Sequence, residues 1–454
     1  MTLATSSVGC VQTASRIDLA RLDKEVVAAS HESIADAPPD IPALTGPVAD
    51  ATAVQAYVQR ALVENRTVQA ARHNVMALRH RIRQVTALDD PVVSNTIFPV
   101  PSVAPQYSLM GYNPYNMTLA QQFPWFGTLQ LRGQVAERDA QVALAELAAA
   151  QLDTVAAVKR AYHDLHAALT IDQALQENHA LLVDFQTIAR QRLERGGSQQ
   201  DVLRAEVLLS ELQRDRATNR QAIASARAAL GRQVHASPNE DLRTAPEVAL
   251  NDVPFQVDQL QGLAMAARPE LQGRLAAVAR DEVNVALAHK RSMPNITLGL
   301  TYMNMEKTNS VTPATAAGMP NVGLFVGFNV PLDRTKYRAG VSEAQERALA
   351  DLKLYEAQLD ETLGELRDLF AQVQTQRETL GLLRDQVLPR TKNTLELAGT
   401  DYAAGNVDFP TMIAAQREVL MVRIQIAQAE AELGKALASL ERAVGTEINQ
   451  YPTR

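Results

Sequence analysis

The chain has 454 residues, which is long enough for two or three ordinary domains. Its 51 acidic and 44 basic residues nearly balance, so its charge gives no reason to expect nucleic acid as a partner. Aromatic residues make up only 4% of the chain, whereas Ala, Leu, Gln, Glu and Arg dominate long tracts, a composition that favours long helices. No uninterrupted apolar run reaches the roughly 18 residues of a membrane-spanning helix. A β-barrel stays open as an interpretation, since alternating strands barely register in hydropathy.

Residues 1–50 include the segment DAPPDIPALTGP and are expected to form an extended lead-in. They also contain Cys10, the only cysteine, so a disulfide within the chain is excluded. The preceding Ser7, Val8 and Gly9 resemble the lipobox of bacterial lipoproteins, which makes Cys10 a candidate lipidation site. The alternative is an incidental thiol, because neither a basic segment nor an apolar core precedes the cysteine.

Residues 52–233 form the first of two similar segments. A helical pattern over 52–88 is followed by a stretch, about 92–124, that is dense in Pro, Asn, Tyr and β-branched residues and cannot be a single helix. From about 127 to 233 the pattern is again helical, interrupted only by GGSQQD. This half therefore predicts strands followed by a long helical hairpin, and a polar linker over 234–260 comes after it.

Residues 261–445 repeat this order, ahead of a short tail over 446–454. A helix leads into extended segments over about 294–331, and a long helical hairpin over about 338–444 is broken by AAGNVDFP. We therefore interpret the chain as an internal duplication of helix, β-hairpin and long helical hairpin.

The long helices are expected to pack along a coiled-coil seam. At 1.5 Å per residue, a helix of about 65 residues spans on the order of 100 Å, which is too long for a compact domain. In the second long helix, apolar residues recur at alternating three- and four-residue steps between water-tolerant positions. They are Leu352, Leu359, Leu363, Leu366, Phe370, Val373, Leu380 and Val387. This pattern predicts an elongated bundle, although a soluble coiled-coil scaffold would account for these helices equally well.

The extended segments alternate with the period of a β-strand. In NITLGLTYM and NVGLFVGFNVP, apolar residues alternate with mostly small or polar ones, and each segment has about the ten residues that a tilted strand needs to cross a bilayer. In the first half, 107–110 and 115–123 are the best strand candidates. The side chains expected to face lipid are those of Val322, Leu324, Val326 and Phe328.

Two such hairpins give four strands, which cannot close a barrel alone, and an open edge is not tolerated in lipid. Symmetric assembly would close them, and a homotrimer would supply twelve strands around a lumen wide enough for solutes. The expected fold class is therefore mainly α with a membrane β-barrel contribution.

The order of these segments resembles the TolC-like outer-membrane efflux family over about residues 52–444. The resemblance rests on QQFPWFG before the first long helix, GGSQQDVLRAEVLL at the first break and YAAGNVDFPTMIAAQREV at the second. It implies a trimeric twelve-stranded barrel in the outer membrane, continued into the periplasm by an α-helical barrel. The branch that it most resembles works beside heavy-metal cation pumps of the resistance–nodulation–division type.

The resemblance also gives two groups of site residues. A strand–helix junction at the membrane boundary would contain Pro124, Trp125, Gly127 and Pro331. The periplasmic tips, which would form the gate of the tunnel, would contain Gly196, Gly197, Asp201, Tyr402, Gly405 and Asp408.

The tip residues have two interpretations. Glycine supplies the positive φ of a helix reversal, and a carboxylate near a helix N-terminus acts as a cap. In a trimer, the same carboxylates would ring the mouth and act on cations, and Tyr402 could bond Asp201 of a neighbouring hairpin to hold the mouth closed. Thr411 and Ala414 stand where acidic residues of the family are expected, which argues against a strong acidic constriction.

No pattern indicates catalysis, a nucleotide or another cofactor. His163 and His166 are spaced to bind a metal on one helix face, but two ligands make a poor site, so a solvated pair on the tunnel wall is expected. Met303 and Met305 could meet soft metals, although packing at the barrel rim is the favoured interpretation. We therefore expect no metal site.

We expect a passive exit duct of a tripartite efflux pump that exports small solutes, such as drugs or metal cations, and no enzymatic activity. The expected partners are two further copies of the chain, a periplasmic adaptor (membrane fusion protein), an inner-membrane pump and outer-membrane lipid. The alternatives are a soluble coiled-coil scaffold and a periplasmic adaptor, and the two strand pairs argue against the adaptor.

Overall fold

The computed structural model describes residues 53–97, 112–246, 256–306, 319–446 and 448. The whole lead-in with Cys10, most of the C-terminal tail and the candidate strand at 107–110 lie outside these residues. The described chain divides into two compact units, one containing the sheet and one containing the turns of the two helical hairpins. The sheet unit takes its residues from 74–143 and 273–356, and the helical unit from 1–73, 144–272 and 357–454.

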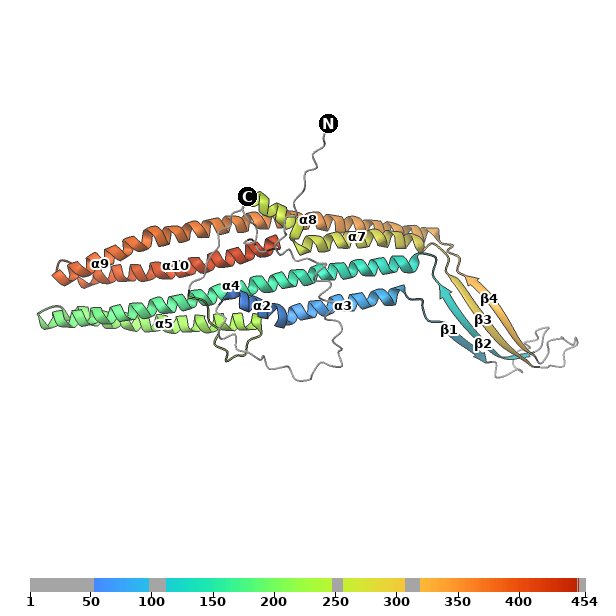
Figure 1. The fold of residues 1–454 in the computed structure, drawn as a ribbon, viewed down its shortest axis with the longest axis horizontal. Helices are drawn as coiled ribbons and strands as arrows, with labels where there is room; N and C mark the ends of the chain where they lie inside the picture. The colour runs from blue at the N-terminus through green and yellow to red at the C-terminus, as the bar shows by residue number, and fades with distance from the viewer. Residues whose placement is uncertain (1–52, 98–111, 247–255, 307–318, 447, 449–454) are drawn as a thin grey trace, which may run out of the picture. The chain divides into compact units, whose positions relative to one another are not determined.

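The sheet unit contains four antiparallel strands in the order β1-β2-β3-β4 (Figure 1). They are β1 (Val92–Ile97), β2 (Tyr112–Phe123), β3 (Ile296–Glu306) and β4 (Pro320–Phe328). The helical parts of this unit belong to α3 (Arg66–Thr86), α4 (Thr128–Glu194), α7 (Pro269–Lys290) and α8 (Arg334–Leu382). Strands from the two halves of the chain meet where β2 pairs with β3.

The register of the sheet places apolar side chains on one face. Leu300 lies opposite Leu119 on one side and opposite Leu324 on the other. Because side chains alternate along a strand, the flanking apolar residues two positions away share this face. On β4 these side chains are well exposed, and Leu324 is 86% exposed. The side chains on the opposite face are mostly small or polar. The ring of Phe325 lies on this face over Gly299, where a Cβ would be only 2.2 Å from the ring, so the position requires glycine.

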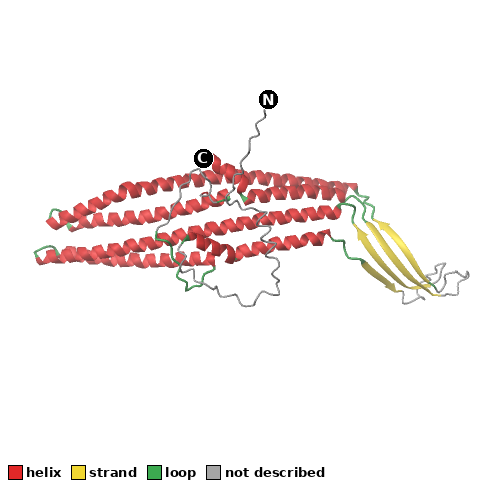
Figure 2. Cartoon of the chain, viewed as in Figure 1, coloured by secondary structure: helices red, strands yellow, loops and turns green. Residues whose placement is uncertain are grey.

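The helical unit contains two long hairpins (Figure 2). The first is formed by α4 and α5 (Gln199–Val234), and the second by α8, the π-turn η3 (Leu383–Val387), α9 (Leu388–Ala404) and α10 (Phe409–Val444). The short helices α2 (Val54–Glu64) and α6 (Val257–Ala267) pack beside them, Tyr57 of α2 against Tyr162 of α4 and Leu260 of α6 against α10.

The predicted seam of the second long helix is buried in part. Leu366, Val373 and Leu380, at seven-residue spacing, lie in a core with Leu433 and Leu440 of α10. Leu352, at the other end of the seam, is exposed. The seam therefore packs within the chain along only part of its length.

The π-turn interrupts a helix that the sequence pattern predicts to be continuous. Pro389 follows it, lacks a backbone N–H, and would clash with the carbonyl of Asp385 in a regular α-helix. Widening the helix by one residue just before the proline relieves that clash.

One described helix, α4, contains an 18-residue window with mean hydropathy 1.2, which is long and apolar enough to cross a membrane by composition alone. The sequence-based expectation that no such helix exists rested on uninterrupted apolar runs. The many alanines of α4 raise its mean hydropathy without forming such a run. Of that window, 44% is buried within the protein, as in a packed core helix.

Candidate functional site

The first hairpin reverses at a pair of glycines. Gly196 adopts φ 96°, a conformation that side chains disfavour, and a Cβ at Gly197 would lie 2.8 Å from the carbonyl oxygen of Arg192. Ser198 then caps α5, its side chain accepting a hydrogen bond from the N–H of Gln200. Asp201 lies in the first turn of α5, where its charge favours the positive end of the helix dipole.

The second hairpin reverses at Gly405, which adopts φ 85°. Its N–H and that of Asn406 donate to the last carbonyls of α9, those of Tyr402 and Asp401. Asp408 caps α10, and its Oδ1 accepts a hydrogen bond of 3.1 Å from the N–H of Thr411. Hydrogen bonds from the Thr411 side chain and backbone lower the pKa of Asp408. Helix capping is thus an observed role of Asp408.

Arg192 and Tyr402 join the two turns. The guanidinium of Arg192 lies 4.4 Å from the centre of the Tyr402 ring, and its Nη1 donates a hydrogen bond of 3.0 Å to the Tyr402 carbonyl. The Tyr402 ring is 1% exposed and packs against the ring of Phe409, with 5.6 Å between ring centres. The turns of both hairpins are therefore held by one aromatic cluster and one cation.

The Tyr402 hydroxyl is buried and has no hydrogen-bond partner of good geometry among the described residues. Burial raises the pKa of this hydroxyl, the Arg192 guanidinium lowers it, and the Asp201 carboxylate raises it further. Tyr402 and Asp201 thus lie close enough to interact, across two hairpins of the same chain. The bond predicted between them stays a prediction.

The sequence did not indicate Arg192 as a residue of the candidate site. An arginine in the last turn of a helix reads as an ordinary partner of the helix dipole, and nothing in the sequence shows that its side chain crosses to the other hairpin.

The strand–helix junctions lie in the sheet unit. Pro124 follows β2, and Gly127, at φ 84°, precedes α4 with Lys290 3.9 Å from the place where a Cβ would be. Trp125 and Phe126 stack edge to face, with 5.8 Å between ring centres. Pro331 lies between β4 and α8. Proline is compatible with both places, because neither requires a ladder or helix N–H there.

The prediction of a solvated histidine pair is wrong. A Cβ at Gly434 of α10 would lie 2.5 Å from the His163 ring, so His163 packs directly over that glycine. Burial, aided by His166, Lys159 and Lys435, lowers the pKa of His163 to about 4. His166 has its Nδ1 3.2 Å from Thr244 Oγ1, and burial lowers its pKa as well. Both rings serve as packed, neutral side chains.

The described residues hold no group of three or more His, Cys, Asp or Glu side chains arranged for a metal ion. Met303 lies on the face of β3 opposite the exposed apolar one and is partly buried. The side chain of Met305 lies outside the described part of the structure.

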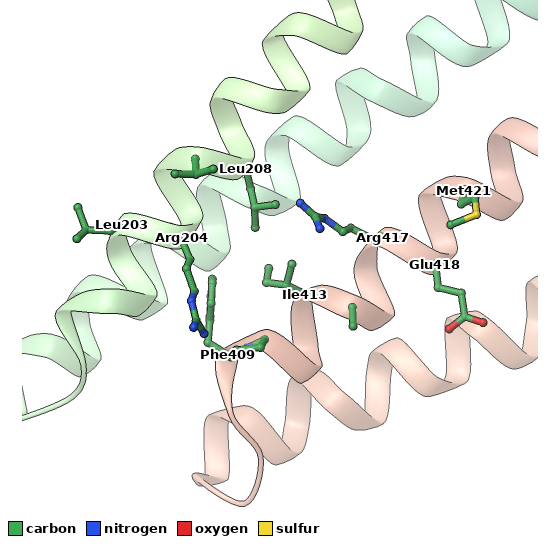
Figure 3. Close-up of a pocket in the computed structure, with 11 residues that line it drawn as sticks. Leu203, Arg204, Leu208, Phe409, Ile413, Arg417, Glu418 and Met421 are labelled. Carbon is green, nitrogen blue, oxygen red and sulfur yellow. The ribbon is translucent and has the colours of Figure 1, made fainter.

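A groove runs between α5 and α10 beside the turns (Figure 3). Arg417 reaches across it to Glu211, with Nη2 2.6 Å from Oε2. Leu203, Val207 and Met421 line the groove and are each more than half exposed. The groove is therefore an open, largely apolar surface with a charged pair at one side.

The model of the outer membrane efflux protein family matches residues 57–233 and 260–446, one match in each half of the chain. No curated protein sequence matches significantly. Among solved structures, the outer-membrane channel OprN is similar at 21% identity and TM-score 0.72, over 88% of this chain and 91% of that one. CusC is similar at 17% identity and TM-score 0.71, over 87% and 92%. The outer membrane protein VceC from Vibrio cholerae is similar at 16% identity and TM-score 0.71, over 87% and 96%.

Proposed function

Since the chain belongs to the outer membrane efflux protein family, we propose that it forms the exit duct of a tripartite efflux pump. The protein is located in the outer membrane, and the relatives in its fold are channels, which speaks against an enzyme. The family match across both halves carries the proposal. The exposed apolar face of the sheet supports it, because a soluble scaffold or a periplasmic adaptor would have no use for such a face.

The membrane part is proposed to be a twelve-stranded barrel made by a homotrimer. One chain supplies four strands, and β1 and β4 are edges that have no neighbour within the described sheet. Three copies would pair β4 of one chain with β1 of the next and remove every edge. Val322, Leu324, Val326 and Phe328 would then face lipid. The long hairpins would continue as an α-helical barrel into the periplasm, with the turns at its far end.

The turns are proposed to gate this duct. Arg192, Tyr402 and Phe409 hold the two hairpins together, and Asp201 and Asp408 place carboxylates beside them. In a trimer, three copies of this cluster would surround the mouth, so loosening it should widen the opening. No covalent chemistry is needed, because the inner-membrane pump would supply the energy.

The groove between α5 and α10 is proposed to receive the helical hairpin of a periplasmic adaptor. Its exposed Leu203, Val207 and Met421 suit the apolar face of an amphipathic helix, and Arg417 and Glu211 offer charges at its side. The transported class is proposed to be small solutes, either drugs or metal cations, with the heavy-metal branch suggested by QQFPWFG and SQQDVLRAE.

Deleting the gene tests this function. The deleted strain should become more sensitive to metal cations or drugs, and the intact chain should restore resistance and sediment with outer membranes. A chain recovered only in the soluble fraction would contradict the proposal. Purified protein should also form pores in planar bilayers and give a trimer after cross-linking.

A further inference from the structure

A groove lies in the sheet unit where the end of α7 meets the start of α8. It combines positive charge with apolar surface. Its lining includes His289, Met293, Pro331, Arg334, Tyr337 and Arg338. Of these residues, only Pro331, at the strand–helix junction, belongs to a site described above.

The rim of the groove carries cationic side chains that form no ion pair among the described residues. Arg334 and Arg338 line the groove and are exposed, and Lys336 lies between them in the sequence. Lys290 and Arg291 lie in the sequence between the groove residues His289 and Met293. Among the described residues, none of these five side chains forms an ion pair with a carboxylate, and Lys336 instead lies 5.9 Å from the Tyr337 ring. The two arginines that line the groove, Arg334 and Arg338, therefore offer charge to an anion.

Helix electrostatics account for only part of this charge. Lys290 ends α7, where a cation favours the negative end of the helix dipole. Arg334 and Lys336 begin α8, where a cation meets the positive end, and that first turn contains no acidic residue. Asp333 caps α8 through hydrogen bonds of 3.0 and 3.1 Å from the N–H groups of Thr335 and Lys336. Arg334 and Lys336 are therefore not favoured by the helix dipole, and Asp333 is the one carboxylate that the helix start itself supplies.

The groove continues the exposed apolar face of the sheet. Phe328, Val330 and Leu332 are exposed, Leu332 by 83%, and Arg334 follows two residues later. A change from exposed apolar residues to cations within so few positions is typical of a membrane boundary, where acyl chains give way to charged headgroups. The cations thus lie at the height at which a phospholipid would present its phosphate.

We propose that this groove binds the phosphate headgroup of an anionic phospholipid at the periplasmic boundary of the outer membrane. Arg334 and Arg338 would donate to the phosphate oxygens, as the planar guanidinium fork suits them well. Met293 and Leu332 would contact the glycerol end of the acyl chains. This inference rests on the proposed barrel, since it takes the sheet to lie in lipid.

Native mass spectrometry of the full-length trimer tests the proposal. The detergent-purified protein is mixed with equal amounts of phosphatidylglycerol and phosphatidylcholine, and the lipids retained are counted. Wild type should retain phosphatidylglycerol in preference. Arg334→Gln with Arg338→Gln should lower that preference by about fivefold for each charge removed. The matched control is Arg347→Gln with Lys353→Gln, two cations of the same helix that pair with Glu343 and Glu356.

Equal retention of the two lipids by wild type, or an equal loss in the control, would overturn the proposal. So would displacement of the bound lipid by millimolar inorganic phosphate, which would identify free phosphate as the ligand. Conductance in planar bilayers separates this inference from the proposed function. Normal pores without a lipid preference would reject the lipid site alone, whereas a lipid preference without pores would reject the duct.

Discussion

The guanidinium of Arg192 lies 4.4 Å above the ring of Tyr402 and donates to the Tyr402 carbonyl, so one arginine of the first hairpin holds both the side chain and the backbone of the second. The ring is buried against Phe409, which excludes water from the contact and strengthens the attraction. Any movement that separates the two turns must break this contact.

Replacing Arg192 with Gln should loosen the turns. The change removes a cation–π contact worth roughly 0.5–2 kcal/mol and a charge-assisted hydrogen bond. We expect larger and more frequent openings in single-channel recordings, with the trimer intact on cross-linking. Arg195→Gln, an exposed arginine one turn along, is the matched control. If both variants conduct alike, Arg192 does not hold the gate.

The double variant Asp201→Ala, Tyr402→Phe should also raise the single-channel conductance in planar bilayers. The pair removes the carboxylate that acts on the buried hydroxyl, and it removes the hydroxyl itself, while the ring and its packing remain. If the wild-type channel is already open and the double variant has the same conductance, Asp201 has a capping role only.

The reversal points were predictable from the sequence because they depend on local backbone chemistry. Gly196 and Gly405 both adopt positive φ, as a glycine that interrupts a long helical pattern suggests. The strands β3 and β4 were predictable for a similar reason, since their two-residue alternation repeats over about ten residues each.

The contacts between hairpins were not predictable. Nearly every face of these long helices offers a polar residue, so the sequence alone cannot say that Arg192 crosses to Tyr402 or that His163 packs on Gly434. The π-turn was missed because the helical pattern continues on both sides of Pro389. The contacts between hairpins depend on the rotational phase of one helix against another, which a single chain's periodicity does not determine.

Leu324→Arg should impair insertion of the sheet, at a cost of roughly 2–4 kcal/mol if the residue lies near the bilayer midplane. Leu324 is on the exposed apolar face, whereas a side chain at the neighbouring position 323 would lie on the other face, and a Cβ added to Gly323 would meet open space. Gly323→Ser should therefore be tolerated. The amount of trimer in the outer-membrane fraction measures both effects, and equal losses would reject the assignment of the lipid-facing side.

The stability of the helical unit should fall as His163 is forced to take a proton. Burial favours the neutral ring and lowers the pKa of His163 from 6.5 to about 4 in the folded protein. In the unfolded chain, His163 binds that proton near the ordinary pKa of histidine. The contribution of the neutral ring to the free energy of unfolding is therefore complete above about pH 6.5 and is lost as the pH falls towards 4. This shift in the pKa of His163 corresponds to about 3 kcal/mol of the free energy of unfolding. His163→Gln should flatten the decline of the thermal midpoint between pH 7.5 and 4.5, while His179→Gln, on the same helix, should keep the wild-type slope. Parallel slopes for wild type and His163→Gln would mean that the ring against Gly434 is not the group that titrates.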